Sequence, residues 1–163
     1  MLFVVPACLN VGCSTEEPPA GPMVGKRAPE IVDGVEQWLH SPEVSLADLA
    51  GRPVLLYFWH PRDGRSPATL AHVQRLAAAF GERGLATIGL CVCDEPAEVE
   101  PLIAQRKLTF PIGLDSDADL HQRFYRVHEA GTPYCYLVGR EQLIVWEGPP
   151  GKLTARRIRK HLP

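Results

Sequence analysis

The length, composition and charge of the chain already exclude several classes of protein. With 163 residues, of which 45% are hydrophobic and 22% charged, the chain can bury the core of one domain and is too apolar to be disordered throughout. Its formal net charge of -2, with no long basic run, argues against a nucleic-acid-binding protein. No apolar stretch reaches the roughly 20 residues that a transmembrane helix needs.

The first 23 residues differ in composition from the rest of the chain. Residues 1–13 are mostly apolar and end in Gly12-Cys13, whereas residues 14–23 are polar and rich in proline. The first part resembles the end of a bacterial lipoprotein signal peptide, in which a small residue precedes the cysteine that becomes lipidated. Cys13 is the better candidate for that cysteine, and Cys8 is the second.

On this interpretation residues 14–23 are a tether and residues 24–163 form the folded domain. The predicted location is then the bacterial cell envelope, with the membrane contacted only through the lipid anchor. The alternative is an ordinary N-terminus on a cytoplasmic protein.

A strand that stops at the start of a helix is the strongest local signal. Residues 53–58 are apolar, β-branched and aromatic, which predicts a buried strand. After a loop, Ser66 is placed to cap a helix that begins with Pro67. Apolar residues then recur on one helical face, at Leu70, Val73, Leu76, Ala77 and Phe80. The free N–H groups and partial positive charge at such a helix start favour an anionic nucleophile there.

The remaining elements alternate between strands and helices. Turn residues and hydrophobic periodicity predict a buried strand over 85–93, a helix over 97–107 that starts late or kinks at Pro101, a short edge segment over 108–112, a short helix over 115–126, a hairpin of strands 134–138 and 143–147, and a terminal helix over 153–162. Cys91 and Cys93 alternate on the second of the buried strands, too far apart for an easy disulfide.

These landmarks, in this order, resemble thioredoxin-like proteins of the TlpA/ResA type and of the redoxin (AhpC/TSA-like) type. Residues 24–31 are similar to the G-x-x-A-P-x-F entry of those domains, and Ser45 and Asp48 are spaced to cap the helical turn that follows. Phe58-Trp59 stands where the family places F-W before its active-site helix. The resemblance implies a three-layer α/β sandwich, with a mixed central sheet and helices on both faces.

The resemblance also implies a thiol-disulfide oxidoreductase whose pattern is F-W-x-x-x-C-x-x-C. In this chain Asp63-Gly64-Arg65-Ser66 occupies the C-x-x-C segment, so both thiols are absent. Asp63 is an anion that would cap the helix or favour its dipole. Ser66 could act as a nucleophile only with a base beside it, for which His60 is the nearest candidate. Whether the protein is an enzyme is therefore left open.

Two functional hypotheses follow from this conflict. The first is a redox-degenerate family member that binds a protein or peptide in a groove formed by Trp59, Thr132 and Pro133, because Thr132-Pro133 matches the pair that carries the family's cis-proline. The second is an unorthodox thiol redox or antioxidant enzyme that uses Cys93 or Cys135 as a displaced thiol. In both, we expect a monomer with no cofactor, no metal and no nucleic-acid partner.

Overall fold

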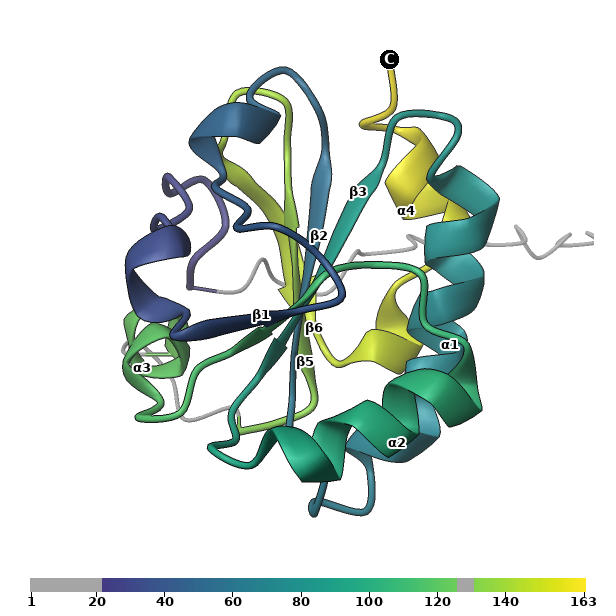
Figure 1. Cartoon of the computed structure of the whole chain (residues 1–163). Helices are drawn as coiled ribbons and strands as arrows, with labels where there is room; N and C mark the ends of the chain where they lie inside the picture. The colour runs from purple at the N-terminus through teal and green to yellow at the C-terminus, as the bar shows by residue number, and fades with distance from the viewer. Residues whose placement is uncertain (1–21, 126–130) are drawn as a thin grey trace, which may run out of the picture.

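The computed structural model of the protein describes residues 22–125 and 131–163. Within these residues the chain forms one mixed six-stranded sheet in the order β1-β4-β3-β2-β5-β6 (Figure 1). The strands are β1 (Gln37–Leu39), β2 (Val54–Trp59), β3 (Ala86–Cys91), β4 (Ile112–Leu114), β5 (Tyr134–Val138) and β6 (Ile144–Gly148). The pairs β2–β3 and β3–β4 are parallel, and the other three pairs are antiparallel.

Helices cover both faces of the sheet, which gives the three-layer α/β sandwich that the sequence predicts (Figure 1). One face carries α1 (Ser66–Phe80), α2 (Pro96–Arg106) and α4 (Ala155–Arg159), and the other carries α3 (Asp119–Tyr125). Short 3₁₀ helices lie at Val32–Gly34, Ala47–Leu49 and Pro150–Lys152. None of the described helices has the length and hydropathy of a bilayer-spanning segment.

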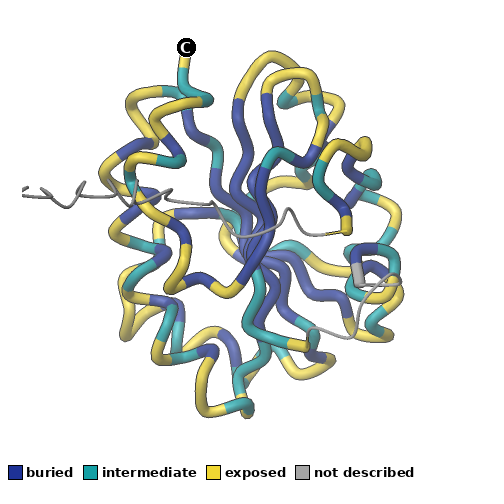
Figure 2. Tube along the Cα trace, turned by 180° about the vertical axis from the view of Figure 1, so that it is seen from behind, coloured by how far each residue is buried: buried dark blue, intermediate teal, exposed yellow. Residues whose placement is uncertain are grey.

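The core lies on both sides of the central strand. Every residue of β2 is buried, as are most residues at the centre of the sheet (Figure 2). The side chains of β2 alternate between the two core clusters. Leu55, Tyr57 and Trp59 face α1 and α2, whereas Leu56 and Phe58 face α3. This central position explains why residues 53–58 read as a continuous apolar run rather than an alternating one.

Several element boundaries differ from the prediction. Residues 108–111 precede β4, and β4 lies between β1 and β3 because β1 pairs with it and takes the edge of the sheet. The strand over 85–93 ends at Cys91, where the Cys93 N–H donates to the Cys91 carbonyl at 3.0 Å and the chain turns. The terminal helix is limited to Ala155–Arg159, capped by Thr154. The predicted cap at Ser45 is confirmed by a 3.1 Å bond from the Asp48 N–H to the Ser45 hydroxyl.

Candidate functional site

The loop between β2 and α1 lies at the carboxyl end of the central strand, and Tyr57 anchors the helix that follows it. Tyr57 is fully buried, and its hydroxyl donates to the Ser66 carbonyl at 2.9 Å. The same hydroxyl lies 2.7 Å from the Thr69 hydroxyl. These contacts fix the first turn of α1 to the sheet, so the residues of the loop are held by a rigid frame.

Asp63 is the centre of a hydrogen-bonded cluster at the start of α1. Its Oδ1 accepts the Ser66 backbone N–H at 2.5 Å. Its Oδ2 accepts the Ser66 hydroxyl at 2.7 Å and the Thr132 hydroxyl at 2.5 Å. Asp63 therefore satisfies a free N–H of the helix start, as the sequence predicts for this residue. The prediction that Ser66 is the N-cap is wrong, because Ser66 is the first residue of α1 and its hydroxyl points back to Asp63.

The environment keeps Asp63 ionised. Partial burial alone would raise the pKa of Asp63, but the hydrogen bonds from Thr132 and Ser66 and the nearby Arg65 charge hold that pKa below its usual value. A carboxylate with three such donors has few lone pairs left for a substrate. Asp63 thus joins the start of α1 to the loop at Thr132 and does not offer a free reactive group.

The segment Gly131–Pro133 lies against the start of α1. The peptide bond between Thr132 and Pro133 is cis. Arg65, which is exposed, donates from a guanidinium nitrogen to the Thr132 carbonyl at 2.8 Å. Thr132 is therefore bonded to the start of α1 twice, through its carbonyl to Arg65 and through its hydroxyl to Asp63. The backbone of Thr132 is consequently held next to an exposed cation.

No serine nucleophile is assembled here. Ser66 is fully buried, and its hydroxyl accepts the His60 backbone N–H at 3.1 Å while donating to Asp63. The His60 ring accepts the Arg62 N–H through Nδ1 at 3.0 Å. The imidazole and the hydroxyl are therefore engaged with other partners, and His60 does not serve as a base for Ser66. No group of three or more His, Cys, Asp or Glu side chains in residues 22–125 and 131–163 could hold a metal ion.

Trp59 does not line an exposed groove, contrary to the prediction. Its side chain is fully buried in the layer between the sheet and α1, where it stacks on Tyr57 with 6.4 Å between ring centroids. The reason is register, because Trp59 shares a face of β2 with Leu55 and Tyr57. Of the three residues assigned to the groove, only Thr132 and Pro133 remain next to the loop.

The two candidate displaced thiols are both buried. Cys135 lies in β5 with no exposed surface, and burial raises the pKa of its thiol. Cys93 is 6% exposed, and its sulfur accepts the Glu95 N–H at 3.3 Å. A reactive cysteine needs an accessible sulfur and a stabilised thiolate. Cys135 has neither an accessible sulfur nor a stabilised thiolate, and the sulfur of Cys93 is barely accessible.

A buried carboxyl, that of Asp115, directly follows β4, so it lies at the same end of the parallel strands as the loop after β2. Its oxygens accept the Leu120 N–H at 3.1 Å and the His121 N–H at 2.7 Å, so it orders the start of α3. Burial raises the pKa of Asp115 to about 6, helped by the nearby Asp117 and Glu36 charges and opposed by the two N–H bonds. Asp115 is thus the acidic group whose protonation the fold favours.

The expected result is a pH-dependent contribution of Asp115 to stability. Because its pKa is higher in the folded chain than the ordinary 3.8, this contribution is complete below about pH 4 and is lost as pH rises through about 6. Urea unfolding should therefore show the stability of wild type falling relative to Asp115→Asn between pH 4.5 and 7.5. Asp48→Asn, at an exposed site, is the matched control. A constant difference between wild type and Asp115→Asn over this range would contradict the assignment.

The three layers and the strand order are those of a thioredoxin-like α/β protein, and the site lies at the carboxyl end of its central strand. The sequence model of the AhpC/TSA family matches residues 24–147, which is most of the chain. The chain therefore belongs to the AhpC/TSA family. This assignment confirms the resemblance that the sequence carries.

The chain is also similar to individual proteins. The thiol-disulfide oxidoreductase ResA of Oceanobacillus iheyensis is 26% identical over 140 residues, covering 85% of this chain and 71% of the relative. The thioredoxin domain of a thiol-disulfide oxidoreductase from Bacteroides vulgatus superposes with a TM-score of 0.67 at 23% identity, over 84% of this chain and 93% of that one. A secreted disulfide oxidoreductase of Mycobacterium tuberculosis gives a TM-score of 0.55 at 19% identity, over 62% of this chain and 72% of that one.

Three contacts of the site are not visible in the sequence. These are the hydrogen bonds Tyr57–Ser66, Arg65–Thr132 and Asp63–Thr132, whose partners are between 9 and 69 positions apart in the chain. A weak signal exists for Asp63, because an aspartate three residues before a helix start is a common capping arrangement. For Tyr57 the signal is its position between Leu55 and Trp59 on the inward face of a strand.

Proposed function

We propose that the protein is a redox-degenerate member of the thiol-disulfide oxidoreductase family that binds an extended segment of a partner protein. One observation carries the proposal. Where the family pattern calls for two thiols, an Asp63 carboxylate is held by three hydrogen bonds from Ser66 and Thr132. A carboxylate cannot form a mixed disulfide, and the three hydrogen bonds leave this one few lone pairs for proton transfer.

The partner would contact the surface formed by Arg65, Thr132 and Pro133, which we call the cis-proline surface. Arg65 is exposed and uses one guanidinium nitrogen for the Thr132 carbonyl, which leaves other donors for a partner. An extended peptide could therefore pair with the backbone of this loop and place an acidic side chain or a carbonyl on Arg65. The buried frame of Tyr57, Ser66 and Asp63 supports a surface of fixed shape.

The proposed location is the bacterial cell envelope. The M. tuberculosis relative is described as secreted, and the chain's first residues resemble a lipoprotein signal. Cys13 and the rest of residues 1–21, including most of the predicted tether, lie outside the described residues. The alternative cytoplasmic location would remove the need for lipidation and leave the binding surface unchanged.

Binding of an unfolded chain tests this proposal. The probe is reduced, carboxymethylated lactalbumin, which is unfolded and has no free thiols, titrated into the full chain. We expect saturable binding with a Kd of roughly 10–100 μM and NMR shift changes centred on Thr132. Arg65→Gln should weaken binding about fivefold, because one charged contact is lost.

The matched control is Arg75→Gln on the exposed part of α1, which should bind as the wild type does. Absence of binding up to a probe concentration of roughly 1 mM would overturn the proposal. Equal loss in Arg65→Gln and Arg75→Gln would overturn it as well, because the binding would then depend on overall charge and not on the cis-proline surface.

A further inference from the structure

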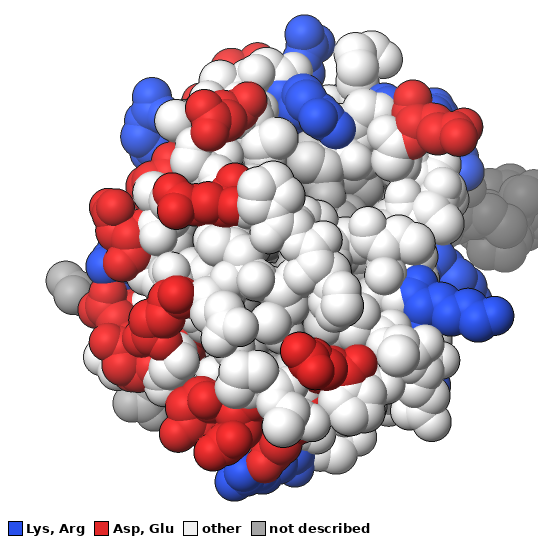
Figure 3. All heavy atoms as spheres, viewed as in Figure 1, with Lys and Arg blue, Asp and Glu red and all other residues white. Residues whose placement is uncertain are grey.

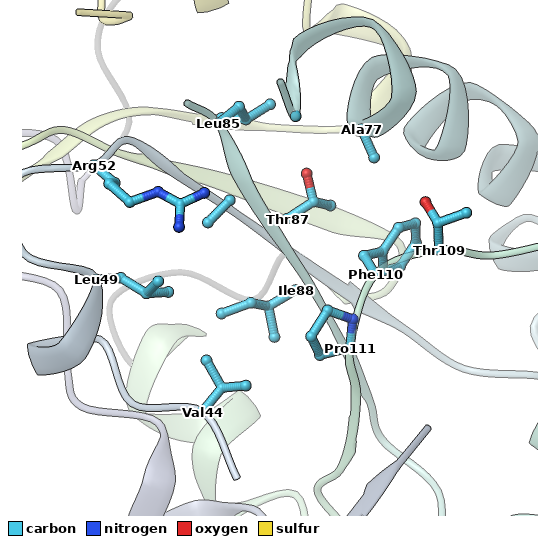
Figure 4. Close-up of a pocket in the computed structure, with 12 residues that line it drawn as sticks. Val44, Leu49, Arg52, Ala77, Leu85, Thr87, Ile88, Thr109, Phe110 and Pro111 are labelled. Carbon is cyan, nitrogen blue, oxygen red and sulfur yellow. The ribbon is translucent and has the colours of Figure 1, made fainter. Parts of the chain in front are cut away.

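A cavity of about 320 Å³ lies at the amino end of β3 (Figure 4), and none of the residues of the cis-proline surface lines it. The site at Asp63 follows the carboxyl end of β2, whereas this cavity is lined by Leu85, Ala86 and Thr87, at the start of the parallel strand β3. Six strand residues separate the two ends, a distance of about 17 Å. In the space-filling view the upper centre of this face is hollowed and largely uncharged (Figure 3). The volume is at the lower end of the range for small-ligand sites.

The cavity occupies a gap in the sheet. The Gly89 N–H donates to the Pro111 carbonyl at 2.9 Å, and the Cys91 carbonyl accepts the Asp115 N–H at 2.8 Å. Backbone groups of alternate strand residues point to the same side, so those of Thr87 also point toward β4. However, the pairing of β3 with β4 begins at Gly89 and Ile112, so no strand pair reaches Thr87, and residues 109–111, which precede β4, line the cavity beside it. The Thr87 N–H and carbonyl therefore face the cavity.

The side chain of Thr87 also lacks a partner. Thr87 is 8% exposed, and its hydroxyl oxygen is buried without a hydrogen bond to any residue of 22–125 or 131–163. A buried hydroxyl without a partner destabilises a protein unless something else supplies one. Thr87, whose hydroxyl is drawn in Figure 4, thus contributes this group to the cavity in addition to its unpaired backbone donor and acceptor.

A cation and apolar side chains complete the lining. The Arg52 guanidinium points toward the space in front of β3 (Figure 4). Its Nε donates to the Gly84 carbonyl at 3.3 Å, and Arg52 forms no ion pair within the described part of the chain. The remaining walls are largely apolar and include Val44, Ile88 and Phe110. The site therefore combines one free positive charge, a strand-type hydrogen-bonding pair and apolar surface.

We propose that this cavity binds the carboxylate end of an acylated apolar amino acid, either as a free molecule or as the C-terminal residue of a peptide. The ligand's amide N–H would donate to the Thr87 carbonyl, as in an antiparallel strand pair. Its carboxylate would accept from the Thr87 N–H, the Thr87 hydroxyl and Arg52. Its side chain would lie against the apolar walls. A simple fatty acid would leave the Thr87 carbonyl without a donor.

The test is an NMR titration of the full chain with N-acetylleucine at pH 7. We expect saturable shifts of the Thr87 amide with a Kd near roughly 1 mM or tighter, and no shift at Thr132. N-acetylleucinamide, which lacks the charge, and octanoate, which lacks the N–H, should each bind about fivefold more weakly. Acetyl-Ala-Ala-Leu separates the two sources: equal affinity supports a peptide C-terminus, and weaker affinity supports the free acylated amino acid.

Substitutions in the protein provide a second test of the same proposal. Arg52→Gln should raise the Kd for N-acetylleucine about fivefold, and Thr87→Val, which keeps the shape of the side chain, about threefold. Arg83→Gln, at another exposed arginine that does not line the cavity, is the matched control and should bind as wild type does. The proposal is overturned if the Thr87 amide does not shift, if octanoate binds as tightly as N-acetylleucine, or if Arg52→Gln leaves the Kd unchanged. Shifts at Thr132 alone would report on the cis-proline surface instead.

Discussion

The double variant Asp63→Cys/Ser66→Cys is expected to reduce insulin disulfides with dithiothreitol as final reductant, at least tenfold faster than wild type, a rough lower bound for a restored dithiol. The substitutions create a C-x-x-C segment in which residue 66 is the first residue of α1. A thiol before a helix start has a lowered pKa and attacks disulfides as a thiolate. The frame that Tyr57 makes with Ser66 and Thr69 uses backbone and neighbouring groups, so it persists in the variant.

The control for this result is Asp63→Ala/Ser66→Ala, which removes the same hydrogen bonds without adding thiols. It should be as inactive as wild type in the insulin assay. Cys93→Ser and Cys135→Ser in the wild-type background should change nothing. If wild type is already active and either serine variant abolishes that activity, the redox-degenerate proposal fails and the displaced-thiol hypothesis is correct.

Phe124→Ala is expected to lower the free energy of unfolding by about 3–5 kcal/mol, the usual cost of removing a buried phenyl ring. Phe124 has no exposed surface, and its ring centroid lies 5.1 Å from that of Phe58 and 4.9 Å from that of Tyr136. Together with Leu120 it packs α3 on the sheet, and its carbonyl accepts the Tyr136 hydroxyl at 3.1 Å. The loss should appear as a lower urea midpoint with an unchanged slope.

Phe124→Leu separates packing from loss of the helix contact. Leucine retains most of the apolar volume, so this variant should lose only about 1–1.5 kcal/mol. A loss below about 1 kcal/mol in Phe124→Ala would mean that α3 contributes little to the stability of the domain, because such values are typical of exposed positions.

The fold was predictable because its signals are local. The buried run before Trp59, the helix that follows it and the hairpin after Pro133 each show their pattern within a few residues, and all three are confirmed. The position of β4 was not predictable in this way. Its place inside the sheet depends on β1, a strand of three residues that is too short to give a periodicity.

The sequence identified most residues of the site but not the contacts between them. Asp63 was correctly placed at the start of α1, but its bond to Thr132 joins residues 69 positions apart, which no local pattern reports. The predictions for Ser66 and Trp59 were wrong by a single position or face. Ser66 is the first residue of α1 and not the residue before it. Trp59 lies on the face of β2 that packs in the core, and in a strand the choice of face decides whether a side chain is buried. The cavity at Thr87 depends on where β4 starts and has no signal in the sequence.

The burial of the three described thiols has a consequence for how this protein responds to alkylating reagents. Cys91, Cys93 and Cys135 are free and lie within the core cluster beneath α1 and α2. A maleimide or iodoacetamide reaches the fully buried sulfurs of Cys91 and Cys135 when the surrounding elements separate, so their rate of labelling follows the population of opened molecules and not the chemistry of the thiol. In residues 24–163, alkylation of these three native cysteines therefore reports on core opening without an introduced cysteine.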